Sequence, residues 1–126
     1  MMRAVRTARE VVELYNLVVW NEHDLALAGE LFADKVIRHG VGEAHTLTHD
    51  QAVQRVADMW QVCDSLHFDL NIVVAGEDGE HVAIVYDSTV MADGAETNVA
   101  SIEVFRVVDG QIIEVWNCGY QQGVWR

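Results

Sequence analysis

Glu103 is the side chain of this sequence best placed to carry acid–base chemistry. It falls on the apolar side of the segment 98–108, in which apolar and polar residues alternate as in a β-strand. That side also carries Val99, Ser101, Phe105 and Val107. Apolar neighbours disfavour the charged form of a carboxyl group and raise its pKa. We therefore expect Glu103 to be a neutral hydrogen-bond donor.

His39 is the second candidate, because imidazole is the usual general base near neutral pH. It ends the short strand-like segment 35–39, directly before a turn that contains Gly40 and Gly42. Each candidate also has an ordinary structural explanation. Glu103 could lie on the convex face of a sheet, in solvent or at a dimer interface, and His39 could be a turn residue whose ring bonds to the backbone.

The periodicity of the chain predicts three helices followed by a sheet. Apolar residues at helical spacing predict a first helix over residues 4–20, and Asp24 is placed to cap a second that ends near residues 33–34. Thr48 and Gln51 have capping-box spacing before a third helix. The period then changes to two, which predicts strands over 67–75, 81–91, 98–108 and 111–120. Asp109-Gly110 is typical of a two-residue hairpin turn.

This order of elements indicates an α+β fold in one domain, residues 1–126, with the helices on one face of the sheet. The formal charge is 8 − 20 = −12, and Lys35 is the only lysine, so we expect no nucleic-acid partner. No apolar run has the length of a membrane span, and the first ten residues have no apolar core of a signal peptide. Cys63 and Cys118 are two isolated thiols, so we expect a cytoplasmic protein that does not bind membranes.

Two motifs give the sequence a family resemblance. They are Trp20-Asn21-Glu22-His23-Asp24-Leu25 with Glu30-Leu31-Phe32-Ala33-Asp34, and the segment 104–116, Val-Phe-Arg-Val-Val-Asp-Gly-Gln-Ile-Ile-Glu-Val-Trp. With the element order, they resemble the SnoaL-like branch of the nuclear transport factor 2-like superfamily. The resemblance implies a cone-shaped fold, with three N-terminal helices packed on a strongly curved, mainly antiparallel sheet. Polyketide cyclases, ketosteroid isomerases and epoxide hydrolases share this cone, and some members are not catalytic.

The resemblance also implies site residues. In similar isomerases the position of Glu103 holds an acidic hydrogen-bond donor to an enolate, and the position of His39 holds the catalytic base. Similar epoxide hydrolases have a catalytic aspartate at Asp87, but the arginine that accompanies it is Val85 here. Similar cyclases have an essential aspartate where this chain has Asn117, and an amide cannot exchange a proton as a carboxylate does. We take His39, Glu103, Asp87 and Asn117 as candidate catalytic residues.

A second set of residues is expected to contact the substrate. On the first helix, periodicity places Tyr15 inward, whereas the family motif places the inward position at Asn16, and we keep both. The full set is Tyr15, Asn16, Trp20, Val85, Phe105 and Val115. His39, His45 and His49 do not have the spacing of a metal site, so we expect no metal.

The sequence thus predicts a cofactor-independent enzyme that acts on a small hydrophobic carbonyl or hydroxylated molecule by general acid–base chemistry. Isomerase, aldol-type cyclase and dehydratase activities all fit. The alternative is a non-catalytic module of the same fold that binds a small ligand or dimerises. Trp116, Val104 and Ile102 lie on the opposite face of the sheet, and we expect a homodimer to cover them.

Overall fold

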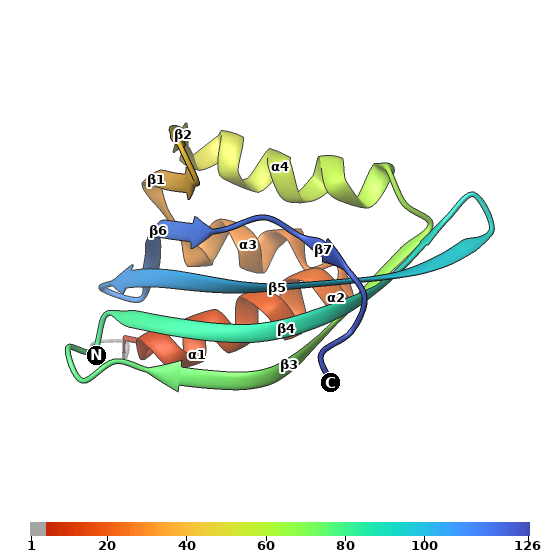
Figure 1. Cartoon of the computed structure of the whole chain (residues 1–126). Coiled ribbons are helices and arrows are strands. Elements are labelled where there is room, and N and C mark those ends of the chain that lie inside the picture. The colour runs from red at the N-terminus through yellow and green to blue at the C-terminus, as the bar shows by residue number, and fades with distance from the viewer. Residues whose placement is uncertain (1–4) are drawn as a thin grey trace.

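The computed structural model describes residues 5–126, which form a layer of helices against one curved sheet (Figure 1). The helical elements are α1 (Ala8–Leu14), the π-helical segment η1 (Tyr15–Val19), α2 (Trp20–Glu22), α3 (Leu25–Leu31) and α4 (His49–Gln61). The strands are β1 (Phe32–Gly40), β2 (Glu43–Thr48), β3 (Ser65–Ala75), β4 (His81–Ala92), β5 (Ala95–Val108), β6 (Gln111–Asn117) and β7 (Gln121–Gln122). The α+β prediction is confirmed.

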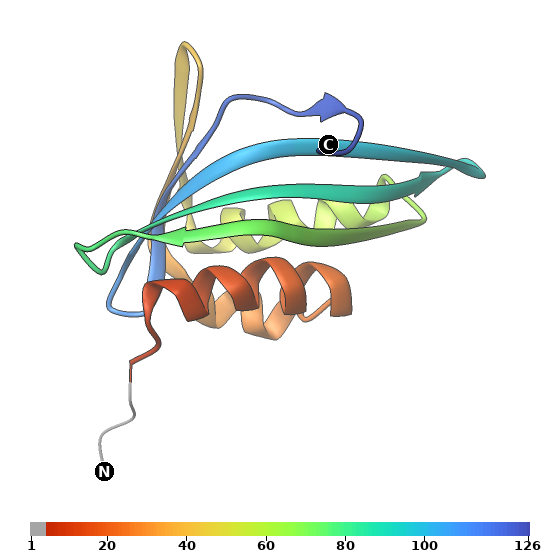
Figure 2. The same ribbon diagram turned by 60° about the horizontal axis from the view of Figure 1, so that its bottom comes forward.

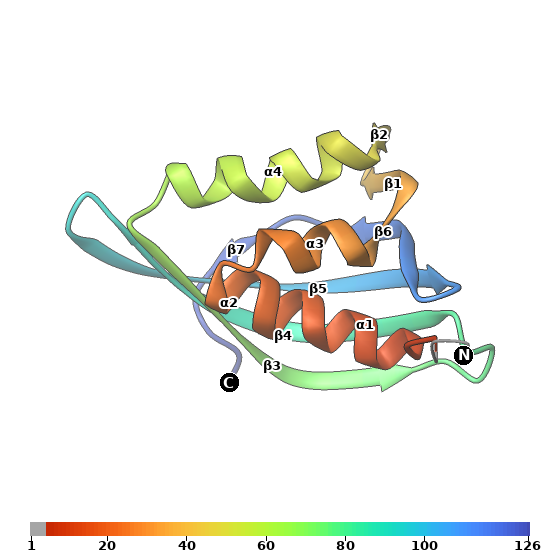
Figure 3. The ribbon, with the colours of Figure 1, turned by 180° about the vertical axis from the view of Figure 1, so that it is seen from behind.

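The sheet order is β2-β1-β6-β5-β4-β3, and β7 pairs with β5 beyond the end of β6. Within the described chain β1 and β6 run parallel, and the other neighbouring strands run antiparallel. The register shifts by a bulge in β3 and again between β5 and β6. Bulges bend strands, and the sheet curves over the helices, which all lie on one of its faces (Figures 2 and 3).

The predicted starts of the second and third helices are confirmed by their caps, whereas the first helix begins at Ala8, after its N-cap Thr7, and not at residue 4. Thr48 and Gln51 make both bonds of a capping box at α4, and Asp24 accepts a hydrogen bond from the backbone N–H of Leu27 at α3. The first helix is continuous from α1 through α2, but its middle turn widens into η1. The end of the second helix was predicted too late, because Phe32 begins β1 and is buried there.

Strand β2 was not predicted. It forms a hairpin with β1 across a turn at Gly42, whose φ of +84° favours glycine. The four later strands and the Asp109-Gly110 hairpin turn are confirmed, with Val108 paired to Gln111 and both turn residues at positive φ.

The core lies between the helices and the concave face of the sheet. On β4 the inward side chains are Val82, Ile84, Tyr86 and Ser88, and on β5 they are Ser101, Glu103, Phe105 and Val107. Cross-strand partners share a face, so the pairing of Ile84 with Glu103 joins these two rows. None of the helices in residues 5–126 is long and apolar enough to cross a membrane.

Candidate active site

A cavity of about 280 Å³ lies between the helices and the concave face of the sheet. Its walls are mainly apolar and come from the first helix, α4 and strands β1 and β3–β5, together with Tyr120 from the segment before β7. The lining residues are Tyr15, Asn16, Trp20, Arg38, Arg55, Met59, Leu66, Phe68, Ser88, Val90, Val99, Glu103 and Tyr120. Its volume is just below the range of about 300–1,000 Å³ usual for ligand pockets, so it suits a small ligand.

Glu103 lies in this cavity, on the inward face of β5, with 7% of its surface exposed. Its surroundings differ from those expected, because its Oε1 lies 3.9 Å from Nη2 of Arg38. A nearby guanidinium favours the ionised form of a carboxyl group. The neutral donor role expected from the sequence assumed apolar neighbours alone, whereas the structure places the positive charge of Arg38 beside this carboxyl group.

Two arginines of the cavity were missed in the sequence. Arg38 alternates with the buried Val36 on β1, and Arg55 lies within the apolar stripe of α4, one residue before the buried Val56. Burial alone would lower the pKa of Arg55, but Tyr15, Tyr120 and Glu103 outweigh burial, and the net shift is upward. Both arginines could have been found from the sequence, because each is a charged residue at a position that the periodicity of its strand or helix places inward.

Two tyrosines, Tyr15 and Tyr86, lie close enough to Glu103 for its charge to affect them. Burial raises the pKa of Tyr15, although Arg55 and Arg38 act in the opposite direction. Burial, followed by the charge of Glu103, also raises the pKa of Tyr86. The Tyr86 hydroxyl is fully buried and interacts with the side chains of Glu103 and Tyr120. Both phenols therefore stay protonated at neutral pH and can donate hydrogen bonds.

The π-helical turn explains why periodicity and motif disagreed about Tyr15 and Asn16. The N–H of Trp20 bonds to the carbonyl of Tyr15, five residues back, and this wider turn brings both Tyr15 and Asn16 to the cavity wall. The Asn16 side chain donates to the carbonyl of Val12 at 2.8 Å. Trp20 also lines the cavity, as expected.

Asp87 and Val85 lie on the convex face of β4, so the inward orientation expected for them is wrong. The register decides this, because Asp87 pairs with Ala100 and Val85 with Ile102 on the outward row of β5. Tyr86 and Ser88 occupy the inward positions instead. An acid–base role for Asp87 in this cavity has no geometric support.

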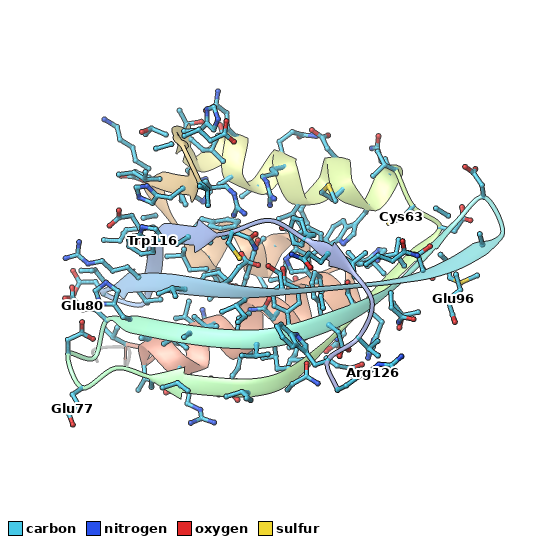
Figure 4. The ribbon with its side chains drawn as sticks, viewed as in Figure 1. Cys63, Glu77, Glu80, Glu96, Trp116 and Arg126 are labelled. Atoms are coloured by element: carbon cyan, nitrogen blue, oxygen red, sulfur yellow. The ribbon has the colours of Figure 1, made fainter. Side chains whose placement is uncertain are left out.

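His39 does not join Glu103 in the cavity. Arg38 points inward, so the next side chain of β1 points outward. Nε2 of His39 lies 2.7 Å from Oε2 of Glu114, and its ring stacks on Trp116 with centroids 4.9 Å apart. Figure 4 marks Trp116 on β6. His39 lines the hollow beside the cavity, but its ring contacts Glu114 and Trp116 and is not part of the cavity wall that contains Glu103.

The remaining predicted residues lie beside or beneath the cavity. Asn117 is the cross-strand partner of Glu103 and lines an adjoining hollow, which shares Arg38, Arg55 and Tyr120 with the cavity. Its Oδ1 accepts hydrogen bonds from Gly119 N and Ser101 Oγ, whereas its buried Nδ2 has no partner in the described chain. Phe105 and Val115 are core residues and not cavity walls.

Comparisons with known proteins agree with this architecture. Residues 11–115 match the family model described as SnoaL-like domain. No curated protein is significantly similar in sequence.

Solved structures share the fold at low sequence identity. A SnoaL-like polyketide cyclase from Agrobacterium tumefaciens is 14% identical, with 92% of each chain covered and a TM-score of 0.75. An epoxide hydrolase from M. tuberculosis, similar to limonene epoxide hydrolases, is 16% identical, with 90% of this chain and 82% of that chain covered and a TM-score of 0.75. A Catenulispora acidiphila protein with a ketosteroid isomerase-like fold is 18% identical, with coverages of 90% and 87% and a TM-score of 0.73. The chain therefore has the predicted nuclear transport factor 2-like fold.

Proposed function

Because this chain belongs to the SnoaL-like domain family, we propose that it is a cofactor-independent enzyme acting on a small, hydrophobic carbonyl compound by general acid–base chemistry. The observation that carries the proposal is the Glu103 carboxylate, which lies in a mainly apolar cavity and is the one carboxyl group in its described wall. The same cavity supplies protonated phenols and a guanidinium. This combination suits the removal of a proton next to a carbonyl group.

The proposed first step is common to isomerases, aldol-type cyclases and dehydratases. The Glu103 carboxylate takes the proton from the carbon beside the carbonyl, the C–H electron pair forms the enolate, and negative charge develops on its oxygen. Tyr15 and Arg55 both line the cavity and are the candidate donors to that oxygen. The enolate then takes the proton at another carbon, attacks a second carbonyl, or expels a β-hydroxyl group.

Deuterium exchange tests this step without knowledge of the natural substrate. The bicyclic ketone 2-tetralone is incubated with the protein in D₂O, and loss of the α-proton signals is followed by NMR. We expect exchange well above the rate in buffer. Binding of the ketone without accelerated exchange would instead support the non-catalytic binding module. Absence of binding would contradict both functions.

A non-catalytic module that binds a small ligand is the second candidate function, because the cavity lacks polar residues expected from similar enzymes. The two polar residues expected from similar enzymes, His39 and Asp87, lie outside the cavity, and Asn117 replaces the aspartate of similar cyclases. The proposed chemistry therefore depends on Glu103 with residues not expected from those enzymes.

We also propose that the chain forms a homodimer through the convex face of the sheet. Ile72, Val74 and Ile102 are large apolar side chains exposed on that face, in the same cross-strand rows as Trp116 and Val104. No helix covers this face in the described chain (Figure 2). In a symmetric dimer the same patch of each subunit would contact that of the other, and both apolar surfaces would be buried.

Ile102→Lys is expected to convert the dimer to a monomer, because it places a desolvated charge at the centre of this patch. Size-exclusion chromatography with light scattering measures the mass. Leu25→Lys, at an exposed position on the helical side, should leave the dimer intact. A wild-type mass of one chain, at the concentrations used for assay, would contradict the proposal.

The expected cellular setting is also a proposal. Cys63 and Cys118 are both free thiols, which supports a reducing, cytoplasmic compartment. The charge of −12 supports a small molecule, and not a nucleic acid, as the ligand. The proposed substrate requires no cofactor or metal, because Glu103 supplies the proton acceptor.

A further inference from the structure

The charges in the cavity do not balance. Its described walls hold two guanidinium groups, Arg38 and Arg55, and one carboxylate, Glu103. Glu103 lies 3.9 Å from Arg38, and its charge also acts on Arg55, so one carboxylate faces two guanidinium groups. An arginine side chain stays charged in proteins. The cavity therefore carries an excess positive charge inside a chain whose net charge is −12.

The unused polar groups around Arg55 are also donors. Arg55 bonds to the hydroxyl of Tyr120, which lies between the cavity and the adjoining hollow. Asn117 Nδ2, in the wall of that hollow, is buried without a partner in the described chain. A buried donor or charge without a partner destabilises a protein, because it has lost its hydrogen bonds to water. The described cavity wall thus offers one acidic acceptor, Glu103, for two guanidinium groups. The carboxylate of the adjoining hollow, Glu43, lies 3.5 Å from His45.

We propose that the cavity binds an apolar acid, with the ligand's carboxylate on Arg55 and its hydrocarbon body against Trp20, Leu66 and Phe68. The planar guanidinium can donate two parallel hydrogen bonds to a carboxylate. The three apolar residues line the same cavity as Arg55. This inference rests on the proposed function and narrows its substrate class to carbonyl compounds that also carry a carboxylate.

Two ligands of nearly equal shape, one charged and one neutral, test whether the cavity prefers a carboxylate. Isothermal titration at pH 7 compares 2-naphthoate with 2-naphthamide, which differ in charge but hardly in size. We expect the acid to bind the wild-type protein about tenfold more tightly or better. In Arg55→Gln the acid and the amide should bind almost equally, whereas Arg55→Lys should keep part of the preference.

Arg106→Gln is the matched control, because Arg106 carries the same charge on the convex side, where it contacts Glu80 and Glu114. It should keep the wild-type preference for the acid. Circular dichroism and a melting curve establish that each variant is folded. Arg55→Lys serves as the test variant if Arg55→Gln does not fold.

The outcomes separate this inference from the proposed function. Equal binding of acid and amide to the wild-type protein would overturn the acid preference and leave the deuterium-exchange test of Glu103 intact. A preference that survives in Arg55→Gln would overturn the role of Arg55. Binding of neither probe, together with no binding of 2-tetralone, would overturn the cavity as a ligand site and the proposed function with it.

Discussion

Glu103→Gln is expected to lower the rate of deuterium exchange into 2-tetralone by about 10²–10⁴-fold, the usual contribution of a general base. Glutamine has nearly the same shape, but its amide cannot take the proton. Affinity for the ketone should change little, since the apolar walls are untouched. Exchange is measured by NMR at saturating ketone, and affinity by titration.

Glu114→Gln provides the matched control. Glu114 is also a partly buried carboxylate beside an arginine, but it lies on the convex face, where it binds His39 and Arg106. Its substitution, and His39→Gln, should leave the exchange rate close to that of the wild type. An unchanged rate in Glu103→Gln would exclude Glu103 as the base. A large loss in His39→Gln, with the fold intact, would return the base assignment to His39.

The substitution also tests the charge of the cavity. Removing the carboxylate leaves Arg38 and Arg55 with no described counter-charge in the cavity wall. The Glu103→Gln variant should therefore bind 2-naphthoate more tightly than the wild type and 2-naphthamide about equally. The same substitution would thus reduce exchange and increase acid affinity, which a general loss of structure cannot do.

The strands that were predicted correctly from the sequence are those with one face buried in the core, because burial of one face makes apolar and polar residues alternate. Strands β3 to β6 each have one face in the core, so their period of two is visible and their turns are marked by Gly and Asp. Strand β2 is exposed along nearly all of its length, so no apolar alternation marks it. Its pairing with β1 depends on the turn at Gly42 and not on burial.

The faces of the strands were harder to predict than the strands. On β4 both faces carry apolar residues, with Ile84 on one and Val85 on the other, so alternation alone does not distinguish Tyr86 from Asp87. A shift of one residue exchanges the two faces. The pairing of Ile84 with Glu103 settles the choice, and it is a contact between strands that the sequence does not state.

The same uncertainty about strand faces explains why the sequence placed His39, and not Arg38, in the site. Arg38 and His39 are adjacent polar residues at the end of β1, and only one of them can face the cavity. The buried Val36 places Arg38 on the inward side. On the first helix, the π-helical turn changes the spacing by one residue, which helical periodicity cannot anticipate. Glu103 was predictable because its neighbours Phe105 and Val107 fix its face.

Phe105→Ala is expected to lower the free energy of unfolding by about 3–5 kcal/mol, the range for a buried phenylalanine. Phe105 is fully buried, and its ring packs edge-to-face on Tyr15 with centroids 5.8 Å apart. Its removal would leave a void beneath Glu103, which rigid neighbouring strands on both sides of β5 can fill only in part. Urea denaturation measures the change, provided that the slope with denaturant stays constant.

Phe105→Leu separates a core role from the substrate contact expected from the sequence. Leucine keeps most of the volume, so the loss of stability should be smaller than with alanine, and affinity for 2-naphthoate should be unchanged because Phe105 does not line the cavity. Val62→Ala, at an exposed position after α4, should cost about 0.5 kcal/mol or less. A weakened affinity for 2-naphthoate in a stable Phe105→Leu variant would place Phe105 at the ligand, whereas an unfolding free energy unchanged in Phe105→Ala would contradict its position in the core.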